Sequence, residues 1–153
     1  MKIKSLRSLA LAVGALALAI AAAAFSATPV QGSGVTDAIN ANQLQGVGDI
    51  RIGQSVYSVI STATILSLGP GPGHTLVGTS THTLDFGGGN TLVTSDDAVL
   101  VPVNNLGLYQ MRVTSTIVSG TGSFAGATGD LTFTGRINLA VGHAEWRVHG
   151  QLR

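Results

Sequence analysis

Apolar and polar residues alternate with a period of two over most of the chain beyond residue 47, and no helical periodicity is found there. In residues 108–119, for example, polar side chains occupy one parity and apolar side chains the other, namely Tyr109, Met111, Val113 and Ile117. Such alternation is typical of an antiparallel strand with one face toward water and one toward a core. The pattern therefore predicts an all-β domain.

The expected strands are separated by turns rich in glycine, proline and asparagine. They cover residues 49–67, 74–86, 91–103, 108–119, 131–139 and 143–152. In the first of them the apolar parity changes near residues 56–59, which indicates either a β-bulge or two consecutive strands. Seven or eight strands in an up-and-down meander close most economically into a barrel, because closure removes exposed edges. We therefore expect a single antiparallel up-and-down β-barrel of about eight strands over residues 47–153, with a two-sheet sandwich as the alternative.

A glycine-rich stretch at residues 119–135 is the most distinctive part of this pattern. It contains five glycines in seventeen residues and sets Phe124 alone between small side chains. Glycine allows the positive φ and the close backbone approach that bulges and barrel corners require. We expect a sharp corner in which Phe124 is buried and at least one of Gly120, Gly122, Gly126 and Gly129 has a positive φ.

The N-terminal 46 residues do not share the alternation. Three basic residues precede an uncharged apolar run at residues 9–25, and small residues close the run shortly before Pro29. This arrangement is typical of a cleaved signal peptide, although a run of this length could nearly span a bilayer as a retained anchor. We expect residues 1–26 to be a signal peptide and the protein to be secreted, periplasmic or held at a bacterial cell surface. Residues 27–46 are expected to form a linker or a loosely docked arm.

Composition excludes several classes of function. Without residues 1–26 the chain keeps five arginines, no lysine and seven acidic residues, for a net charge of −2. It therefore has no basic stripe for nucleic acid and no polybasic patch for anionic lipid. The absence of cysteine excludes disulfides and thiolate chemistry. We expect no cofactor, no nucleic-acid partner and, once the signal peptide is cleaved, no membrane partner. The mature chain has few charged residues for a soluble surface, which favours covering part of that surface by self-association into a homo-oligomer.

Polar residues on the expected last strand form the first candidate for chemistry. His143, Glu145, Arg147 and His149 share one parity there. His143 and His149 would be about 20 Å apart along a straight strand at roughly 3.3 Å per residue, so they cannot share a metal ion. We expect a solvated outer face and no metal site.

Two further polar features lie nearer the expected interior. His82 shares its parity with Leu84 and Phe86, so it is either a buried neutral histidine or an acid/base group of a pocket. Asp96 and Asp97 are adjacent and point to opposite faces of a strand. Either one faces the lumen and the other water, or both lie at a bulge.

The lumen is the expected ligand site. No nucleophile motif and no phosphate-binding loop is found, so the sequence assigns no catalytic residue. The candidate ligand-binding residues of the lumen are Tyr57, His82, Phe86, Tyr109, Met111, Phe133 and Trp146.

Two motifs carry a resemblance to a known family. The stretches GTGSFAGATGDL (residues 120–131) and TLDFGGGNT (residues 83–91) resemble bacterial secreted proteins of the allene oxide cyclase barrel-like group, and dirigent proteins have a similar glycine-rich corner. The resemblance spans about residues 74–153 and implies an eight-stranded barrel of the calycin kind. Plant members of this kind are dimers or trimers that steer cyclisation or coupling of a bound apolar intermediate.

Two classes of function therefore remain open, and with them the question whether the protein is an enzyme. The first is an exported barrel that binds a small apolar ligand or self-assembles. The second is an isomerase or cyclase of the allene oxide cyclase or dirigent kind, acting on an apolar intermediate in the lumen.

Overall fold

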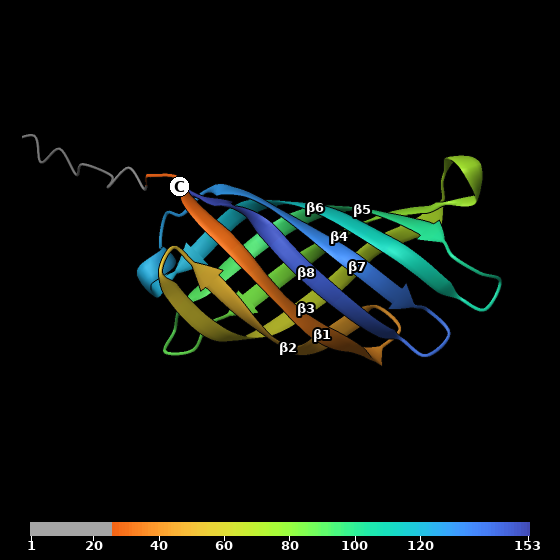
Figure 1. Cartoon of the computed structure of the whole chain (residues 1–153), viewed down its shortest axis with the longest axis horizontal. Helices are drawn as coiled ribbons and strands as arrows, with labels where there is room; N and C mark the ends of the chain where they lie inside the picture. Colours follow the sequence, from red (N-terminus) through yellow and green to blue (C-terminus); the bar gives the residue numbers. More distant parts are fainter. Residues whose placement is uncertain (1–25) are drawn as a thin grey trace, which may run out of the picture.

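The chain folds into a closed barrel of eight antiparallel strands (Figure 1). The computed structural model describes residues 26–153, so the expected signal peptide lies outside the described residues except for Ser26. The elements are, in order, β1 (Thr28–Asn40), β2 (Gln43–Ile52), β3 (Ser55–Pro70), the 3-10 turn η1 (Pro72–His74), β4 (Leu76–Asp85), β5 (Thr91–Pro102), β6 (Leu108–Thr121), the 3-10 turn η2 (Gly122–Phe124), β7 (Gly129–Asn138) and β8 (His143–Leu152).

Each strand pairs with the next strand along the chain, and β8 returns to pair with β1. Figure 1 shows β1 and β8 side by side along the wall that closes the barrel. The expected antiparallel up-and-down barrel is confirmed, and the two-sheet sandwich is excluded. Among residues 26–153 there is no apolar helix of membrane-spanning length.

Residues 28–46 belong to the barrel wall, which corrects the expectation of a linker or arm over residues 27–46. β1 pairs with β8 from Thr28 to Asp37 and with β2 on its other side. Gly34 of β1 and Gly48 of β2 face the interior, where an added Cβ at either position would collide with the Trp146 indole. These two glycines therefore make room for the largest side chain of the core, and the barrel begins at Thr28 rather than at residue 47.

The long segment at residues 49–67 consists of parts of two consecutive strands. β2 ends at Ile52 and β3 begins at Ser55, with Gly53 at a φ of 60° in the turn between them. The change of parity near residues 56–59 follows from this turn, because buried positions have even numbers in β2 and odd numbers in β3. A separate irregularity shifts the β3–β4 register between Ile65 and Ser67.

The glycine-rich corner between β6 and β7 closes one end of the barrel. Phe124 is buried, and Gly122, Gly126 and Gly129 have φ values of 59°, 78° and 137°, as expected. The Phe124 ring lies 4.7 Å from the ring of Phe86 and 6.2 Å from that of Tyr57. We call this end, with its three aromatic rings, the closed end.

The opposite end is formed by the β1–β2, β3–β4, β5–β6 and β7–β8 connections, and we call it the mouth (Figure 1). Apolar residues also face inward there. Leu100, Ile137 and Ala144 are buried, and Leu44, Leu76, Tyr109 and Leu139 pack against them while remaining partly exposed. The interior is therefore filled tightly at the closed end and more loosely at the mouth.

Candidate functional site

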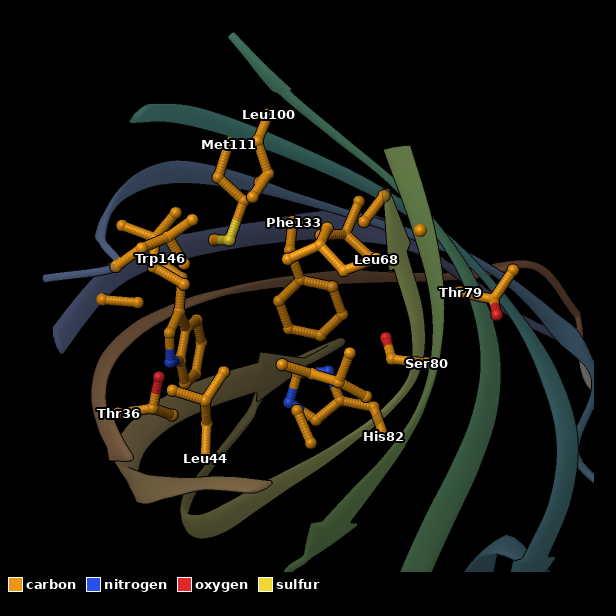
Figure 2. A pocket seen from close by; sticks show the side chains of 18 of the residues that line it. Thr36, Leu44, Leu68, Thr79, Ser80, His82, Leu100, Met111, Phe133 and Trp146 are labelled. Atoms are coloured by element: carbon orange, nitrogen blue, oxygen red, sulfur yellow. The ribbon is translucent and has the colours of Figure 1, made fainter. Parts of the chain in front are cut away.

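A cavity of about 80 Å³ lies inside the barrel between its middle and the mouth (Figure 2). All eight strands contribute to its walls, which are mostly apolar. The lining includes Leu44, Ala63, Ile65, Leu68, Ala98, Leu100, Met111, Val113, Phe133, Ile137, Leu139, Ala144 and Trp146. An eight-stranded barrel has an interior that side chains fill or that holds one small ligand. This barrel combines the two, with a filled closed end and a small cavity behind the mouth.

His82 is the most polar aromatic group of the cavity wall. Its imidazole is stacked on the Phe133 ring, with 4.8 Å between ring centroids and 18° between ring planes, and the two rings lie one over the other in Figure 2. Strand β4 brings His82 and Ser80 to the interior because both have the inward parity. In the β4–β5 hairpin, His82 is opposite Thr94 and Ser80 is opposite Asp96.

These residues and Ser61 form a hydrogen-bonded set that we call the polar cluster: Ser61, Ser80, His82, Thr94 and Asp96. The Asp96 carboxylate accepts hydrogen bonds from the Thr94 hydroxyl at 2.6 Å and the Ser80 hydroxyl at 2.9 Å. His82 Nδ1 lies 3.8 Å from Asp96 Oδ2. On the other side of the ring, His82 Nε2 is 2.7 Å from Ser61 Oγ. Both nitrogens of the imidazole thus face polar groups.

Burial controls the charge of His82. Desolvation disfavours the charged imidazolium and lowers the pKa of His82 below its ordinary value of 6.5, although the Asp96 carboxylate partly opposes this effect. His82 is therefore neutral near pH 7. A neutral imidazole can accept one proton and donate another, which makes it the one side chain at this cavity suited to acid/base chemistry.

The side chains of Ser61, His82 and Asp96 lie next to one another in the same spatial sequence as the serine, histidine and aspartate of a hydrolytic triad. The surroundings of Ser61, however, do not suit acyl transfer. Ser61 is completely buried, and its side chain is not part of the cavity wall. It lies in mid-strand, where β3 pairs with β2 and β4 on its two sides, so nearby backbone N–H groups are used in the sheet and not in an oxyanion hole. The polar cluster is better understood as a support that orients His82.

The seven candidate residues of the lumen are divided between three places. His82, Met111, Phe133 and Trp146 line the cavity. Tyr57 and Phe86 pack with Phe124 at the closed end, away from the cavity. Tyr109 packs against the buried residues near the mouth and lies outside the cavity wall. A role in ligand binding stays a prediction for all seven.

The polar cluster was not assembled from the sequence, although one signal for it was present. Asp96 is buried and Asp97 is exposed, which is the first of the two arrangements expected for this pair. The expected strands at residues 74–86 and 91–103 flank three glycines at residues 87–89, and a hairpin register extended from a turn at these glycines places Ser80 opposite Asp96. No comparable signal links Ser61 to His82: they are diagonal neighbours on the paired strands β3 and β4, and the register of that pair shifts between Ile65 and Ser67, on the side of the connecting turn.

The polar face of β8 points outward, as expected. Glu145, Arg147 and His149 are exposed, and His143 Nδ1 lies 2.7 Å from Asp37 Oδ1 on β1. Within residues 26–153, no group of three or more histidine, cysteine or acidic side chains is arranged to hold a metal ion.

Comparisons with protein-family models, with curated proteins and with solved structures found no match to the chain. The eight-stranded antiparallel barrel is compatible with the calycin-like fold that the sequence resemblance implies. The resemblance to the allene oxide cyclase barrel-like group itself rests on the two sequence motifs alone.

Proposed function

We propose that the barrel binds a small, largely apolar molecule in the cavity behind its mouth. The observation that carries this proposal is a cavity of about 80 Å³ with mostly apolar walls, in a barrel whose closed end is packed with side chains. Pockets for drug-sized ligands are typically about 300–1,000 Å³, so the ligand is small or leaves part of its length in the mouth. The resemblance to barrels that hold apolar intermediates agrees with this proposal.

Trp146 gives a direct test, because it is the only tryptophan of the chain and lines the cavity. Titration with a panel of small apolar compounds is expected to shift or quench its fluorescence. The variant Ala98→Leu places a larger side chain in the cavity wall, where it takes up space that the ligand would occupy. Each methylene group of the ligand that can no longer be buried costs about 0.8 kcal/mol, so the loss of two such groups should weaken binding about tenfold or more. Val99→Leu, at the exposed neighbouring position, is the matched control and should bind normally. Equal binding by both variants, or no binding by the native protein, contradicts the proposal.

A second candidate function is isomerisation of an apolar substrate, and the buried neutral His82 at the cavity wall favours it. His82 would first exchange one of its polar neighbours, Ser61 or Asp96, for the substrate. It would then remove a proton from an activated C–H group and return it to another carbon, so that no external oxidant or reductant is needed. An unsaturated ketone with a migratable double bond is a suitable probe. His82→Gln should abolish its conversion and leave its binding intact. Conversion at the native rate by this variant would contradict the catalytic role.

Export of the protein is also proposed, from the sequence of residues 1–26. Export would place the binding site outside the cytoplasm, so the protein would bind its ligand there. Detection of a mature N-terminus near residue 27 on protein recovered from outside the producing cells would support it.

A further inference from the structure

One buried polar atom, on a residue that lines the cavity, has no partner. Trp146 is 4% exposed, and its Nε1–H makes no hydrogen bond among residues 26–153. A buried indole N–H usually finds an acceptor, and burying it without one is unfavourable. Ser115 Oγ is likewise without a partner, but Ser115 is not part of the cavity wall.

The orientation of the indole is fixed by its neighbours. Its six-membered ring lies over Gly34 and Gly48, where no side chain intervenes. The Phe133 ring contacts it edge-on, with 5.6 Å between ring centroids and 74° between planes. In Figure 2 the indole nitrogen is on the side of the ring that faces Thr36 and Leu44, which also line the cavity. The N–H is therefore on the side of the ring toward Thr36, at the edge of the cavity (Figure 2).

The charges around the cavity restrict the group that can occupy this corner. Among residues 26–153, no lysine or arginine lines the cavity, and the one carboxylate close to its wall belongs to Asp96. A ligand carboxylate would therefore be buried without a cation, which is strongly unfavourable. The indole N–H is only a donor, so the ligand must offer an acceptor that carries no charge.

We propose that the ligand is a neutral apolar molecule with a carbonyl oxygen, such as a ketone, ester or lactone, and that this oxygen accepts a hydrogen bond from Trp146 Nε1–H. This inference rests on the proposed binding function and names the class of its ligand. The hydrocarbon part lies against Leu100, Met111 and Ile137. The carbonyl supplies the partner that the indole lacks.

Three probes of equal heavy-atom number separate the possible classes: methyl pentyl ketone, the alkene in which a methylene group replaces its carbonyl oxygen, and hexanoate. Ligand titrations of isotopically labelled protein are followed by the proton–nitrogen correlation signal of the single indole N–H. The ketone should move this signal downfield and bind about tenfold more tightly than the alkene, as one hydrogen bond of ordinary strength implies. The alkene should bind without the downfield shift, and hexanoate should bind most weakly.

Trp146→Phe removes the donor and keeps an aromatic ring, so the ketone's advantage over the alkene should fall to about twofold or less. Val99→Leu, on the outer face of β5 and outside the cavity wall, should keep the full advantage. Equal binding of ketone and alkene to the native protein, without a shift of the indole signal, would overturn the inference and leave the binding function in place. Tightest binding by hexanoate would also overturn it. Failure of all three probes to bind would overturn both the inference and the proposed function.

Discussion

Asp96 is the only acidic residue buried within residues 26–153, and its neighbours explain how the barrel tolerates it. An isolated carboxylate in an apolar interior is strongly unfavourable unless hydrogen bonds compensate it. Thr94 and Ser80 donate one hydrogen bond to each of its oxygens. Strand pairing places Ser80 directly opposite Asp96, and Thr94 precedes Asp96 by two residues on the same face. The polar cluster is thus built from one hairpin, to which Ser61 of β3 is added.

The same cluster predicts a pH dependence of stability through His82. Because the pKa of His82 is lower in the folded protein than its ordinary value of 6.5, the unfolded chain binds more protons between these two pKa values. The contribution of His82 to stability is therefore complete above about pH 6.5 and is lost as the pH falls toward the folded pKa. Urea unfolding at a series of pH values from about 7.5 down to 5 should show the free energy of unfolding falling with pH more steeply in the native protein than in His82→Gln.

The exposed His149 supplies the control for that experiment. His149→Gln should keep the native slope, since this side chain lies on the outer face of β8. A native slope in His82→Gln as well would show that His82 is not the group responsible.

At the scale of single elements, the glycine-rich corner depends on one side chain. Phe124 fills the space between Tyr57 and Phe86 and closes that end of the barrel. Phe124→Ala should lower the free energy of unfolding by about 3–5 kcal/mol, because the cavity left behind adds to the lost burial. Ser123→Ala, which alters an exposed side chain next to it, should change stability by less than about 0.5 kcal/mol. Similar denaturation midpoints for the two variants would contradict the central role of Phe124.

The sequence predicted those elements whose inward residues are large and apolar, and missed the element whose inward residues are small. β6 and β8 were recognised because Met111, Val113, Trp146 and Val148 alternate with polar residues. β1 was not, because Gly32 and Gly34 occupy inward positions and leave no apolar alternation. A Cβ at Gly34 would collide with the Trp146 indole, more than a hundred residues later in the chain, and a Cβ at Gly32 would collide with Asp49 and Ile50 of β2. A local pattern cannot contain that information.

The candidate site was predicted only in part for a related reason. Parity identifies residues that face inward, and His82, Met111, Phe133 and Trp146 were found in this way. Parity does not give the height of a residue along the barrel axis, which separates Tyr57 and Phe86 at the closed end from the cavity. That height depends on the register of every strand pair around the barrel.

On the scale of the whole molecule, closure by β1 and β8 leaves residues 26–153 without a free strand edge, so copies cannot join by pairing strands, and the outer face is the largest remaining surface. Val35, Val47 and Ile60 lie in one row across β1, β2 and β3 and are 40%, 60% and 49% exposed. Adjacent exposed apolar side chains on a surface with few charges favour self-association. Residues 27–46 do not cover this row as a separate arm, because they form β1 and the start of β2.

We therefore expect sedimentation velocity to show the native protein as larger than a monomer and Val47→Lys as a monomer. A charge in the middle of the row would have to be buried without a partner if the copies still met there. Val101→Lys, at an exposed position on β5, is the control and should sediment like the native protein. A native protein that sediments as a monomer at all concentrations would show that the row is not an interface.

The first strand, β1, starts at the closed end of the barrel, and the last strand, β8, finishes there, so both ends of the described chain lie at the closed end. Thr28 pairs with Leu152, and the backbone N–H of Thr128 beside the corner donates to the carbonyl oxygen of Arg153. Any tether joined ahead of Ser26 or after Arg153 therefore leaves from the end opposite the cavity. A sensor chip or resin that captures the protein through either terminus would attach it at the closed end and leave the mouth, through which a ligand reaches the cavity, unobstructed by the attachment.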